Sequence, residues 1–467
     1  MKFRFIIFCL AGTLSLLMLI SCSGGGGSND GGGASAHFAP AEDETWTFMI
    51  YIAADNNLDG YDDLDIDEIR NGINSSYNSH VNIIVLQDKS GSNDSAMYRI
   101  APDTYERLDD GDSGTGHTSS LGEVNTGDPA VLSDFMSHCK TNFPADRYML
   151  IIWNHGDGTR KKSSSYSDSS YTEVTKAIAE DDTSSDILYI DEVQQAVSAN
   201  FGGARPKIDA IGFDACLMGT IEVACELKDL ASYMCASMAS EWGYGWDYNR
   251  IFSAMTIDSS GISTPETLAK LAVSSYRNST YSVSNQTMSA VDLSLLDQLK
   301  TAVDAFAAGL KNENSQSTIE STRDQSHCFY TTAAEARSYP YIDLGDFACR
   351  VYSNAVYSST LRTLADDVLS SLADTVILAY AGSSYGGYYG SGSTVKKGLS
   401  IFFTEDSDDY EYQWWYTALD TASEYGASYL YGNIDSCTSD SDGTVENWKE
   451  LMEYWYDSDG IRNNDSW

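Results

Sequence analysis

Four short, mostly apolar runs constrain the fold of this 467-residue chain more than any other feature of its sequence. They cover residues 46–52, 81–86, 148–153 and 208–213, and Asp, Asn or Gly follows each within a few residues. Short apolar runs rich in β-forming residues are typical of strands that are buried on both faces, as in parallel sheets.

Helical patterns separate or follow these runs. Strands that alternate with helices predict an α/β fold, in which helices on both faces cover a mostly parallel sheet. Beyond residue 260 the pattern turns more helical and contains one late strand, at residues 398–403. The helices are predicted at residues 58–73, 129–140, 220–230, 265–276, 293–309 and 359–380.

The N-terminus has the features of a lipoprotein signal peptide. Lys2 and Arg4 precede an apolar run over residues 5–20, and Ser21 stands directly before Cys22. Such a leader is removed at residue 21, and acyl chains are attached to the cysteine that follows it. An ordinary cleaved leader with an incidental cysteine is the alternative. The sequence therefore predicts an exported protein of the cell envelope, held by a lipid anchor at the outer membrane or the cell surface.

The mature chain divides into a tether and a large folded part. Residues 22–44 carry the Gly- and Ser-rich tether, which lacks the side chains to build a core. The roughly 430 residues that remain exceed the usual size of one compact core, so two domains and one enlarged domain both stay open. We expect a catalytic domain at 45–260 and a helical region with at least one further strand at 261–467.

Charge and cysteine content exclude some classes of function. The chain has 28 Lys and Arg against 68 Asp and Glu, a net charge of −40, which would repel nucleic acid. A solvated surface accounts for most of these acids. Of nine cysteines, seven remain when Cys9 and Cys22 are left out, so at least one thiol is unpaired within the monomer. The spacing shows no C-x-x-C pair of the kind that binds zinc.

Two strand ends carry residues suited to cysteine proteolysis. The third apolar run leads into Asn154-His155-Gly156, and the fourth into Asp214-Ala215-Cys216. Carboxyl ends of parallel strands meet at the edge where such sheets bind ligands. Cysteine peptidases need an exposed thiol, a nearby imidazole and amide donors for the oxyanion. Each motif is weak by itself, but together they favour Cys216 as nucleophile and His155 as its partner.

At these residues the sequence resembles the clostripain-like cysteine peptidases, which share a structural clan with caspases, gingipains and legumains. The resemblance implies a caspase-like fold and a catalytic dyad of Cys216 and His155. It also implies that the amides of Gly156 and Cys216 stabilise the oxyanion. The matching segments are WTFMIYIAADNNL (46–58), LIIWNHGDG (150–158), 179–193, IDAIGFDACLMGTIEVACEL (208–227) and 240–248, with looser matches at 341–344 and 398–401.

The resemblance further implies a preference for protein or peptide substrates with Arg or Lys at P1. It places Asp214 at the base of the S1 pocket, where a carboxylate would select a basic side chain. The alternative is that Asp214 caps the helix that follows. Residues 240–248 match the family's acidic Gly-Trp loop, although the segment is shorter here and lacks a proline. Glu241 of this loop is a second candidate for the pocket.

A basic cluster follows the predicted histidine. Arg160, Lys161 and Lys162 stand together before a serine-rich stretch that is too polar to form an ordered element. Loops of this kind are common sites of nicking, and relatives are often processed in this interval. An inert surface loop is the alternative. The cluster predicts that the enzyme cuts itself here.

No residue is assigned as a metal ligand from the sequence. Residues 55–60 carry acids or amides at positions one, three and five of a calcium-type loop, but position twelve is Ile66, which cannot bind the ion. This favours a strand end and a helix cap, and the match at 440–443 is weaker. No cofactor is certain. The resemblance leaves calcium open, because dependence on calcium is known in the family but is not universal.

Two other functions stay open at this point. A non-catalytic surface lipoprotein could bind peptide or glycan through aromatic patches, given 31 Tyr and 9 Trp, but it would not explain the two strand-end motifs. A transpeptidase could use the same dyad, since an amine can resolve an acyl-enzyme as water does. The reading that accounts for most residues is a cysteine endopeptidase that cuts after Arg or Lys.

Overall fold

A computed structural model describes most of the chain between residues 45 and 452. The described ranges are 45–73, 80–102, 104–108, 121–158, 178–201, 207–255, 257–258, 261–279, 284–313, 316–329, 340–385, 398–404, 447–448 and 451–452. The predicted leader, Cys22, the tether, the basic cluster at 160–162 and the acidic match at 440–443 lie outside them. All the described residues belong to one compact unit.

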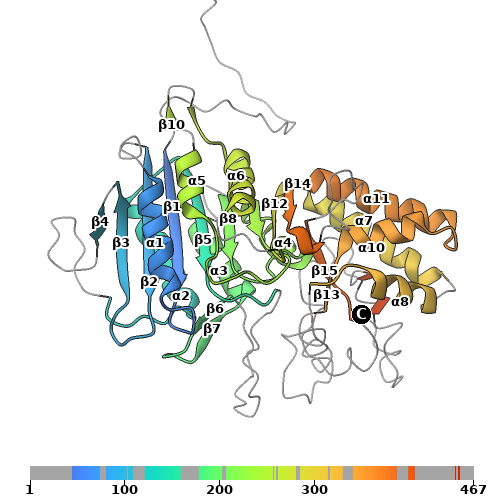
Figure 1. The fold of residues 1–467 in the computed structure, drawn as a ribbon, viewed down its shortest axis with the longest axis horizontal. Coiled ribbons are helices and arrows are strands. Elements are labelled where there is room, and N and C mark those ends of the chain that lie inside the picture. Colours follow the sequence, from blue (N-terminus) through green and yellow to red (C-terminus); the bar gives the residue numbers. More distant parts are fainter. Residues whose placement is uncertain are drawn as a thin grey trace, which may run out of the picture. The chain divides into compact units, whose positions relative to one another are not determined.

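A nine-stranded sheet forms the centre of this unit (Figure 1). Its five inner strands run parallel, and two antiparallel strands extend it at each edge. The four strands predicted from apolar runs are β1, β2, β5 and β8, and all are confirmed. In spatial order the strands are β14 (Val376–Ala381), β12 (Thr287–Asp292), β9 (Ala231–Ala236), β8 (Ile208–Asp214), β5 (Arg147–Trp153), β1 (Trp46–Ala53), β2 (Val81–Asp88), β3 (Ala96–Ala101) and β4 (Thr104–Arg107).

Two apolar cores lie on opposite faces of this sheet. Along β1, Phe48 and Ile50 enter one core while Met49 and Tyr51 enter the other, as the two-residue period of a strand requires. One core takes side chains from α1 (Tyr61–Gly72), α5 (Tyr248–Ala254) and α6 (Pro265–Asn278). The other takes them from α2 (Pro129–Asn142), α3 (Ile190–Phe201) and α4 (Ile221–Leu227). The predicted α/β fold with helices on both faces is confirmed.

One glycine in β8 lets a loop approach the sheet. A Cβ atom at Gly212 would lie 2.6 Å from the indole ring of Trp246, which is buried. Because no side chain occupies that position, the segment before α5 packs directly on β8. This segment includes Glu241 and reaches the end of β8, where Cys216 follows.

The chain continues the central sheet beyond residue 260, where the sequence predicted a more helical region. Strands β12 and β14 belong to that sheet. The helix predicted at 359–380 is too long, because α11 ends at Thr375 and the next six residues form β14. Periodicity does not separate a short apolar run at the end of a helix from a strand. The helices here are α7 (Leu296–Asn312), α8 (Gln316–Gln325), α10 (Leu344–Ser353) and α11 (Ser359–Thr375), which gather beside β14 in Figure 1.

The late strand predicted at 398–403 is present but does not join the central sheet. It is β15 (Ser400–Phe402), and it pairs antiparallel with β13 (Tyr341–Asp343). Ser400 also bridges to Thr220 just before α4. The remaining pairs are β6 (Ala179–Asp181) with β7 (Asp186–Leu188) and β10 (Ile257–Asp258) with β11 (Gly261–Ile262); the short 3-10 turns are η2 (Leu293–Leu295) and η3 (Ser383–Tyr385). Among the described residues, no helix has the length and apolar character needed to cross a membrane.

Candidate active site

The register of β5 and β8 brings the two predicted motifs to one edge of the sheet. The strands pair in parallel, with Trp153 opposite Asp214. The Asn154 N–H donates to the Asp214 carbonyl at 3.2 Å and extends this pairing past the strand end. His155 and Cys216 each lie two residues beyond the aligned positions. The structure therefore places them together at the carboxyl edge.

The backbone after His155 lies against the backbone of Cys216. A Cβ atom at Gly156 would come within 2.2 Å of the Cys216 carbonyl oxygen and 2.9 Å of its nitrogen. Only glycine fits such an approach without displacing one of the loops. The Tyr341 hydroxyl donates to the Asp157 carbonyl at 3.4 Å, so β13 supports the same loop from the C-terminal half of the chain.

The thiol of Cys216 is half-buried and contacts the loop after β9. Its Sγ accepts the Glu241 N–H at 3.1 Å and lies 3.6 Å from the Glu241 carbonyl oxygen. Leu217 has φ of 63°, an uncommon conformation for a residue with a side chain, and its N–H donates to the Ala239 carbonyl at 3.1 Å. None of the six cysteines in the described residues forms a disulfide. Burial raises the pKa of Cys235 to about 12, which makes that thiol unsuited to nucleophilic attack.

Asn57 orients the imidazole of His155. The Asn57 Oδ1 lies 2.6 Å from Nε2 of His155, and a carbonyl oxygen can only accept. With this amide orientation Nε2 carries the proton, so in the neutral ring Nδ1 has the lone pair. A hydrogen bond from the His155 N–H to Asn154 Oδ1 fixes the backbone of the same residue.

The side chain of Asp214 is buried and held by the predicted Gly-Trp loop. Its Oδ2 accepts the Trp246 N–H at 3.1 Å and the Tyr248 hydroxyl at 2.9 Å. Gly245, with φ of 48°, allows the loop to close on this carboxyl, because a Cβ there would lie 2.6 Å from Oδ1. Thr220 caps α4 by accepting the Val223 N–H, so the alternative that Asp214 caps this helix is wrong.

Glu241 faces Asp214 beside the thiol. Burial raises the pKa of Asp214 from 3.8 to about 6, although hydrogen bonds from Trp246 and Tyr248 favour its charged form. Burial, followed by the charges of Asp214 and Cys216, raises the pKa of Glu241 well above its ordinary value. Glu241 is half-buried as a residue, but both its carboxyl oxygens are covered and accept no hydrogen bond from the described residues. The two acids thus retain a proton to a higher pH than they would in water.

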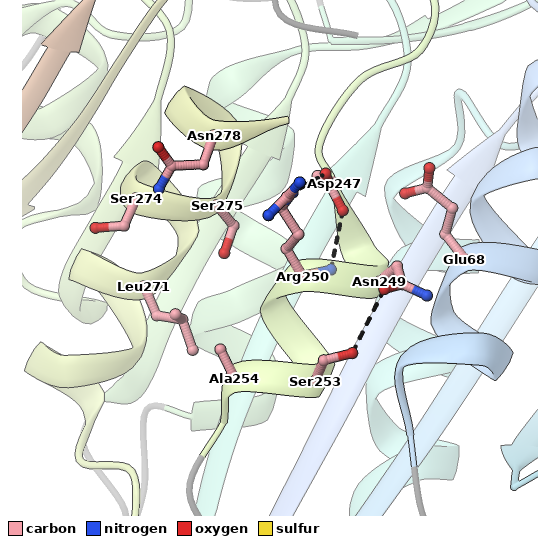
Figure 2. A pocket seen from close by; sticks show the side chains of 10 residues that line it. All are labelled: Glu68, Asp247, Asn249, Arg250, Ser253, Ala254, Leu271, Ser274, Ser275 and Asn278. Carbon is pink, nitrogen blue, oxygen red and sulfur yellow. Dashed lines mark hydrogen bonds and ion pairs between the residues drawn. The ribbon is translucent and has the colours of Figure 1, made fainter. Parts of the chain in front are cut away.

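A cavity of about 600 Å³ lies between α1, α5 and α6 (Figure 2). Its lining residues include Glu68 and an ion pair in which Arg250 Nε lies 2.9 Å from Asp247 Oδ2. Burial and the Asp247 charge raise the pKa of Glu68 to about 7. Glu68 accepts the Tyr248 N–H at 3.0 Å, which connects the cavity to the Asp214 network. Neither His155 nor Cys216 lines it, so it is separate from the thiol.

Three acids at the same sheet edge could hold a metal ion. One oxygen each from Asp55, Asp88 and Glu123 lies within 4.8 Å of the other two. The acidic and amide side chains of the calcium-type loop considered at residues 55–60 do not converge on one point. Asp55 joins this acidic group, whereas Asn57 contacts His155 and Asp59 accepts the Ser90 hydroxyl.

Comparison with known proteins identifies the family. A model described as the Clostripain family matches residues 50–455. Clostripain of Hathewaya histolytica is 31% identical over 478 residues, which covers 88% of this chain and 87% of that protein. The chain belongs to the clostripain family. It is a clostripain-like cysteine endopeptidase, and the resemblance drawn from the sequence is confirmed.

Solved structures of family members share the fold. A secreted C11 cysteine protease from Bacteroides thetaiotaomicron, in complex with an irreversible peptide inhibitor, has a TM-score of 0.51 at 19% identity and covers 78% of this chain and 90% of that chain. An inactive zymogen C11 protease from Parabacteroides distasonis has a TM-score of 0.55 at 20% identity and covers 84% of this chain and 99% of that chain.

Several residues around the family's dyad positions were not anticipated from the sequence. Asn57 could have been noticed, because it follows a strand that neighbours the one leading to His155. Tyr248, which holds Asp214, had no sequence signal beyond its place in the Gly-Trp loop. Phe329 and Tyr385 pack with Cys216 in a small apolar cluster, and no local pattern marks them.

Asp214→Asn should weaken the pH dependence of stability. Burial gives Asp214 a higher pKa in the folded than in the unfolded state, so folding takes up a proton. The stabilisation that Asp214 contributes is therefore fully present below about pH 4 and is lost as the pH rises through about 6. At about 1.36 kcal/mol per pKa unit, the free energy of unfolding falls by up to about 3 kcal/mol over this range. Urea unfolding of both proteins at about pH 4 and about pH 7 measures the difference. The same change at exposed Asp366 is the control, and equal slopes in wild type and Asp214→Asn would contradict the assignment.

Proposed function

We propose that this protein hydrolyses peptide bonds after Arg or Lys, with Cys216 as nucleophile and His155 as proton carrier. The observation that supports this most is the parallel register of β5 with β8. It aligns two loops of which one carries a thiol and the other an imidazole, at the edge where parallel sheets bind ligands. Membership of the clostripain family supports the same residues.

The reaction follows from the groups at this edge. The Cys216 thiol gives its proton to His155 as its sulfur adds to the scissile carbonyl carbon, and the amides of Gly156 and Cys216 stabilise the oxyanion. His155 delivers a proton from its ring to the leaving amine as the C–N bond breaks. Water then attacks the thioester, releases the new carboxylate and restores the thiol. The Asn57 contact at Nε2 leaves Nδ1 as the atom that exchanges the proton.

Selection of a basic P1 side chain follows from the acids beside the thiol. The Glu241 backbone contacts Sγ, and its carboxyl faces buried Asp214. A guanidinium or ammonium entering here would displace the retained proton and form charge-assisted hydrogen bonds. We propose that Asp214 and Glu241 together form the base of the S1 pocket. The 31% identity to clostripain supports this preference.

We propose further that the enzyme is exported and processes itself. The leader at residues 1–21 and Cys22 support a lipid anchor in the cell envelope. The peptide and protein substrates would then lie outside the cell. The similar protease from Bacteroides thetaiotaomicron is described as secreted, and the one from Parabacteroides distasonis as an inactive zymogen. The cluster at Arg160, Lys161 and Lys162 begins five residues after His155 and matches the proposed P1 preference.

Removal of the thiol and of the imidazole should separate the two roles. Cys216→Ala should abolish hydrolysis of an arginyl amide with little change in the unfolding midpoint, because the half-buried thiol only packs against the margin of a small apolar cluster. His155→Ala should lower kcat by about 10²–10⁴-fold, the usual contribution of a general acid or base, while iodoacetamide still alkylates Cys216. Cys349→Ser, at a half-buried thiol on α10, is the matched control. Retained hydrolysis by Cys216→Ala would remove it as nucleophile.

Loss of a pocket carboxylate should weaken basic selectivity. Asp214→Asn should lower kcat/KM for arginyl substrates relative to leucyl ones by roughly tenfold to a hundredfold, since a hydrogen bond to a charged group contributes about 1.5–3 kcal/mol. Glu241→Gln is measured in parallel with the same substrate pair. If only Glu241→Gln changes the ratio, Glu241 alone selects the basic side chain.

Wild-type enzyme should cut itself between about residues 160 and 162. A tethered basic loop has a high effective concentration at the S1 pocket, so it would block substrate until it is cut. Intact-mass measurement after incubation should show two associated chains for wild type and one whole chain for Cys216→Ala. The triple variant Arg160→Gln, Lys161→Gln, Lys162→Gln should stay whole and nearly inactive. One uncut chain in fully active wild type would show that this loop does not gate the enzyme.

A further inference from the structure

The cavity between α1, α5 and α6 has a size and a lining that suit a small organic ligand. Its volume of about 600 Å³ lies within the usual range of about 300–1,000 Å³ for ligand sites. Leu271 and Ala254 contribute apolar surface, and polar groups come from all three helices (Figure 2). Neither His155 nor Cys216 lines it, so a ligand bound there would not cover the thiol.

Glu68 gives this lining a carboxylate that no basic side chain in the described part of the chain neutralises. Its Oε2 accepts the Tyr248 N–H at 3.0 Å. None of the salt bridges found among the described residues includes Glu68. Arg250, the basic residue of the lining, is already paired with Asp247 at 2.9 Å. An ionised Glu68 therefore leaves the cavity with one negative charge in excess.

Two buried acids behind Glu68 add to this negative charge. Asp65 lies one turn earlier on α1, and Asp214 ends β8. Both accept hydrogen bonds from neutral groups, and neither forms a salt bridge with a described residue. Burial, followed by the charges of Asp214 and Glu68, raises the pKa of Asp65 well above its ordinary value. The three acids thus repel one another, and Glu68 is the one that a ligand in the cavity can reach.

A buried hydroxyl faces the same cavity without a partner in the described chain. Ser275 on α6 is only 4% exposed, and its side chain lines the cavity (Figure 2). A serine or threonine within a helix often donates to the carbonyl four residues earlier, as Thr322 does to Thr318 on α8. Ser275 makes no such bond and no other side-chain hydrogen bond to the described residues. Its hydroxyl is therefore available to a ligand.

These groups favour an ammonium ion over other cations. An ammonium is a compact charge with three donors, which a carboxylate oxygen, a hydroxyl and an amide oxygen such as that of Asn278 can accept. A guanidinium prefers both oxygens of one carboxylate, and the Tyr248 N–H already occupies Oε2 of Glu68. Among the described residues, the acids of this lining do not gather as three metal ligands would. The apolar surface of Leu271 suits a methylene chain attached to the charge.

We propose that this cavity binds a primary alkylammonium ion, with Glu68 as its counter-ion, Ser275 as a hydrogen-bond partner and Leu271 beside the alkyl chain. The same chemistry belongs to the lysine side chain of a peptide and to a free polyamine. The site is separate from the proposed dyad and does not depend on peptidase activity.

Binding of the ammonium is linked to a proton. Burial, followed by the charges of Asp247 and Asp214, raises the pKa of Glu68 to about 7, although the Asn249 and Tyr248 N–H groups favour its charged form. The ammonium favours the same charged form, so its binding releases the proton that Glu68 keeps near neutral pH. Affinity therefore rises with pH through about 7. The charged groups that face Glu68 are Asp65 on α1, Asp247 and Arg250 at the start of α5, and Asp214 at the end of β8.

Calorimetric titration of the wild-type full chain with pentylamine tests the site. Its Kd should be in about the millimolar range, as expected for so small a ligand. Binding should be about tenfold tighter at about pH 8 than at about pH 6, since a pKa near 7 falls on binding. Pentanol, which has the same chain without the charge, should bind at least roughly tenfold more weakly. Equal affinity at the two pH values, or equal affinity for pentanol, would overturn the proposal.

Variants assign this binding to the cavity. Glu68→Gln keeps an oxygen for the Tyr248 N–H, so it should fold, weaken pentylamine binding roughly tenfold or more and remove the pH dependence. Ser275→Ala should weaken binding severalfold with the pH dependence intact, and it serves if Glu68→Gln fails to fold. Asp67→Asn, at an exposed acid beside Glu68, and Glu241→Gln, beside the thiol, should bind as wild type does. Undiminished binding in Glu68→Gln or Ser275→Ala, or loss of binding in Glu241→Gln, would overturn the site.

Two further probes distinguish the sources of the ammonium group. N-acetyl-lysine methylamide represents a lysine of a peptide, and spermidine represents a free polyamine. Cys216→Ala is used here, so that the proposed peptidase does not hydrolyse the first probe. The probe with the lower Kd identifies the source, and failure of both to bind as tightly as pentylamine would overturn the ligand class. Hydrolysis of the methylamide by Cys216→Ala would contradict the proposed function and leave the ammonium site intact.

Discussion

The parallel hydrogen-bonded register of β5 with β8 is the interaction on which the rest of the site depends. It sets His155 and Cys216 at equal distances beyond aligned residues, so two loops from separate parts of the sequence meet at one edge. A shift of one residue would turn every side chain of a strand to the opposite face of the sheet. Both faces are buried here, which makes such a shift costly and fixes the register.

The close contact between these loops explains the glycines around them. Gly156 lets the histidine loop touch the Cys216 backbone, and Gly245 lets the next loop close on Asp214. Gly212 admits Trp246 to the surface of β8 in the same way. These glycines thus allow loops that are distant in the sequence to pack closely. The spacing of the motifs along the chain does not reveal which loops approach each other.

Buried negative charge recurs along this edge of the sheet. Asp214 and Glu241 face each other beside the thiol, and Asp55, Asp88 and Glu123 converge beyond β1 and β2. In both places burial raises carboxyl pKa values, because the charged form loses its hydration. Carboxylates in such positions favour a bound cation. At the first group the proposed cation is the basic side chain of the substrate.

The sequence by itself determined the four inner strands, the fold class and the placement of His155 and Cys216 at strand ends, since these depend on local apolar patterning and on motifs. It did not predict that residues 376–381 form a strand instead of continuing α11. A short apolar run can form either a helix end or a strand, and here pairing with β12 determines that it is a strand. Tertiary structure alone placed Asn57 beside His155, Glu241 beside the thiol and Glu123 beside two strand ends. These contacts join residues about 25 to nearly 100 positions apart, and only the packing of the sheet and its loops brings such residues within hydrogen-bonding distance.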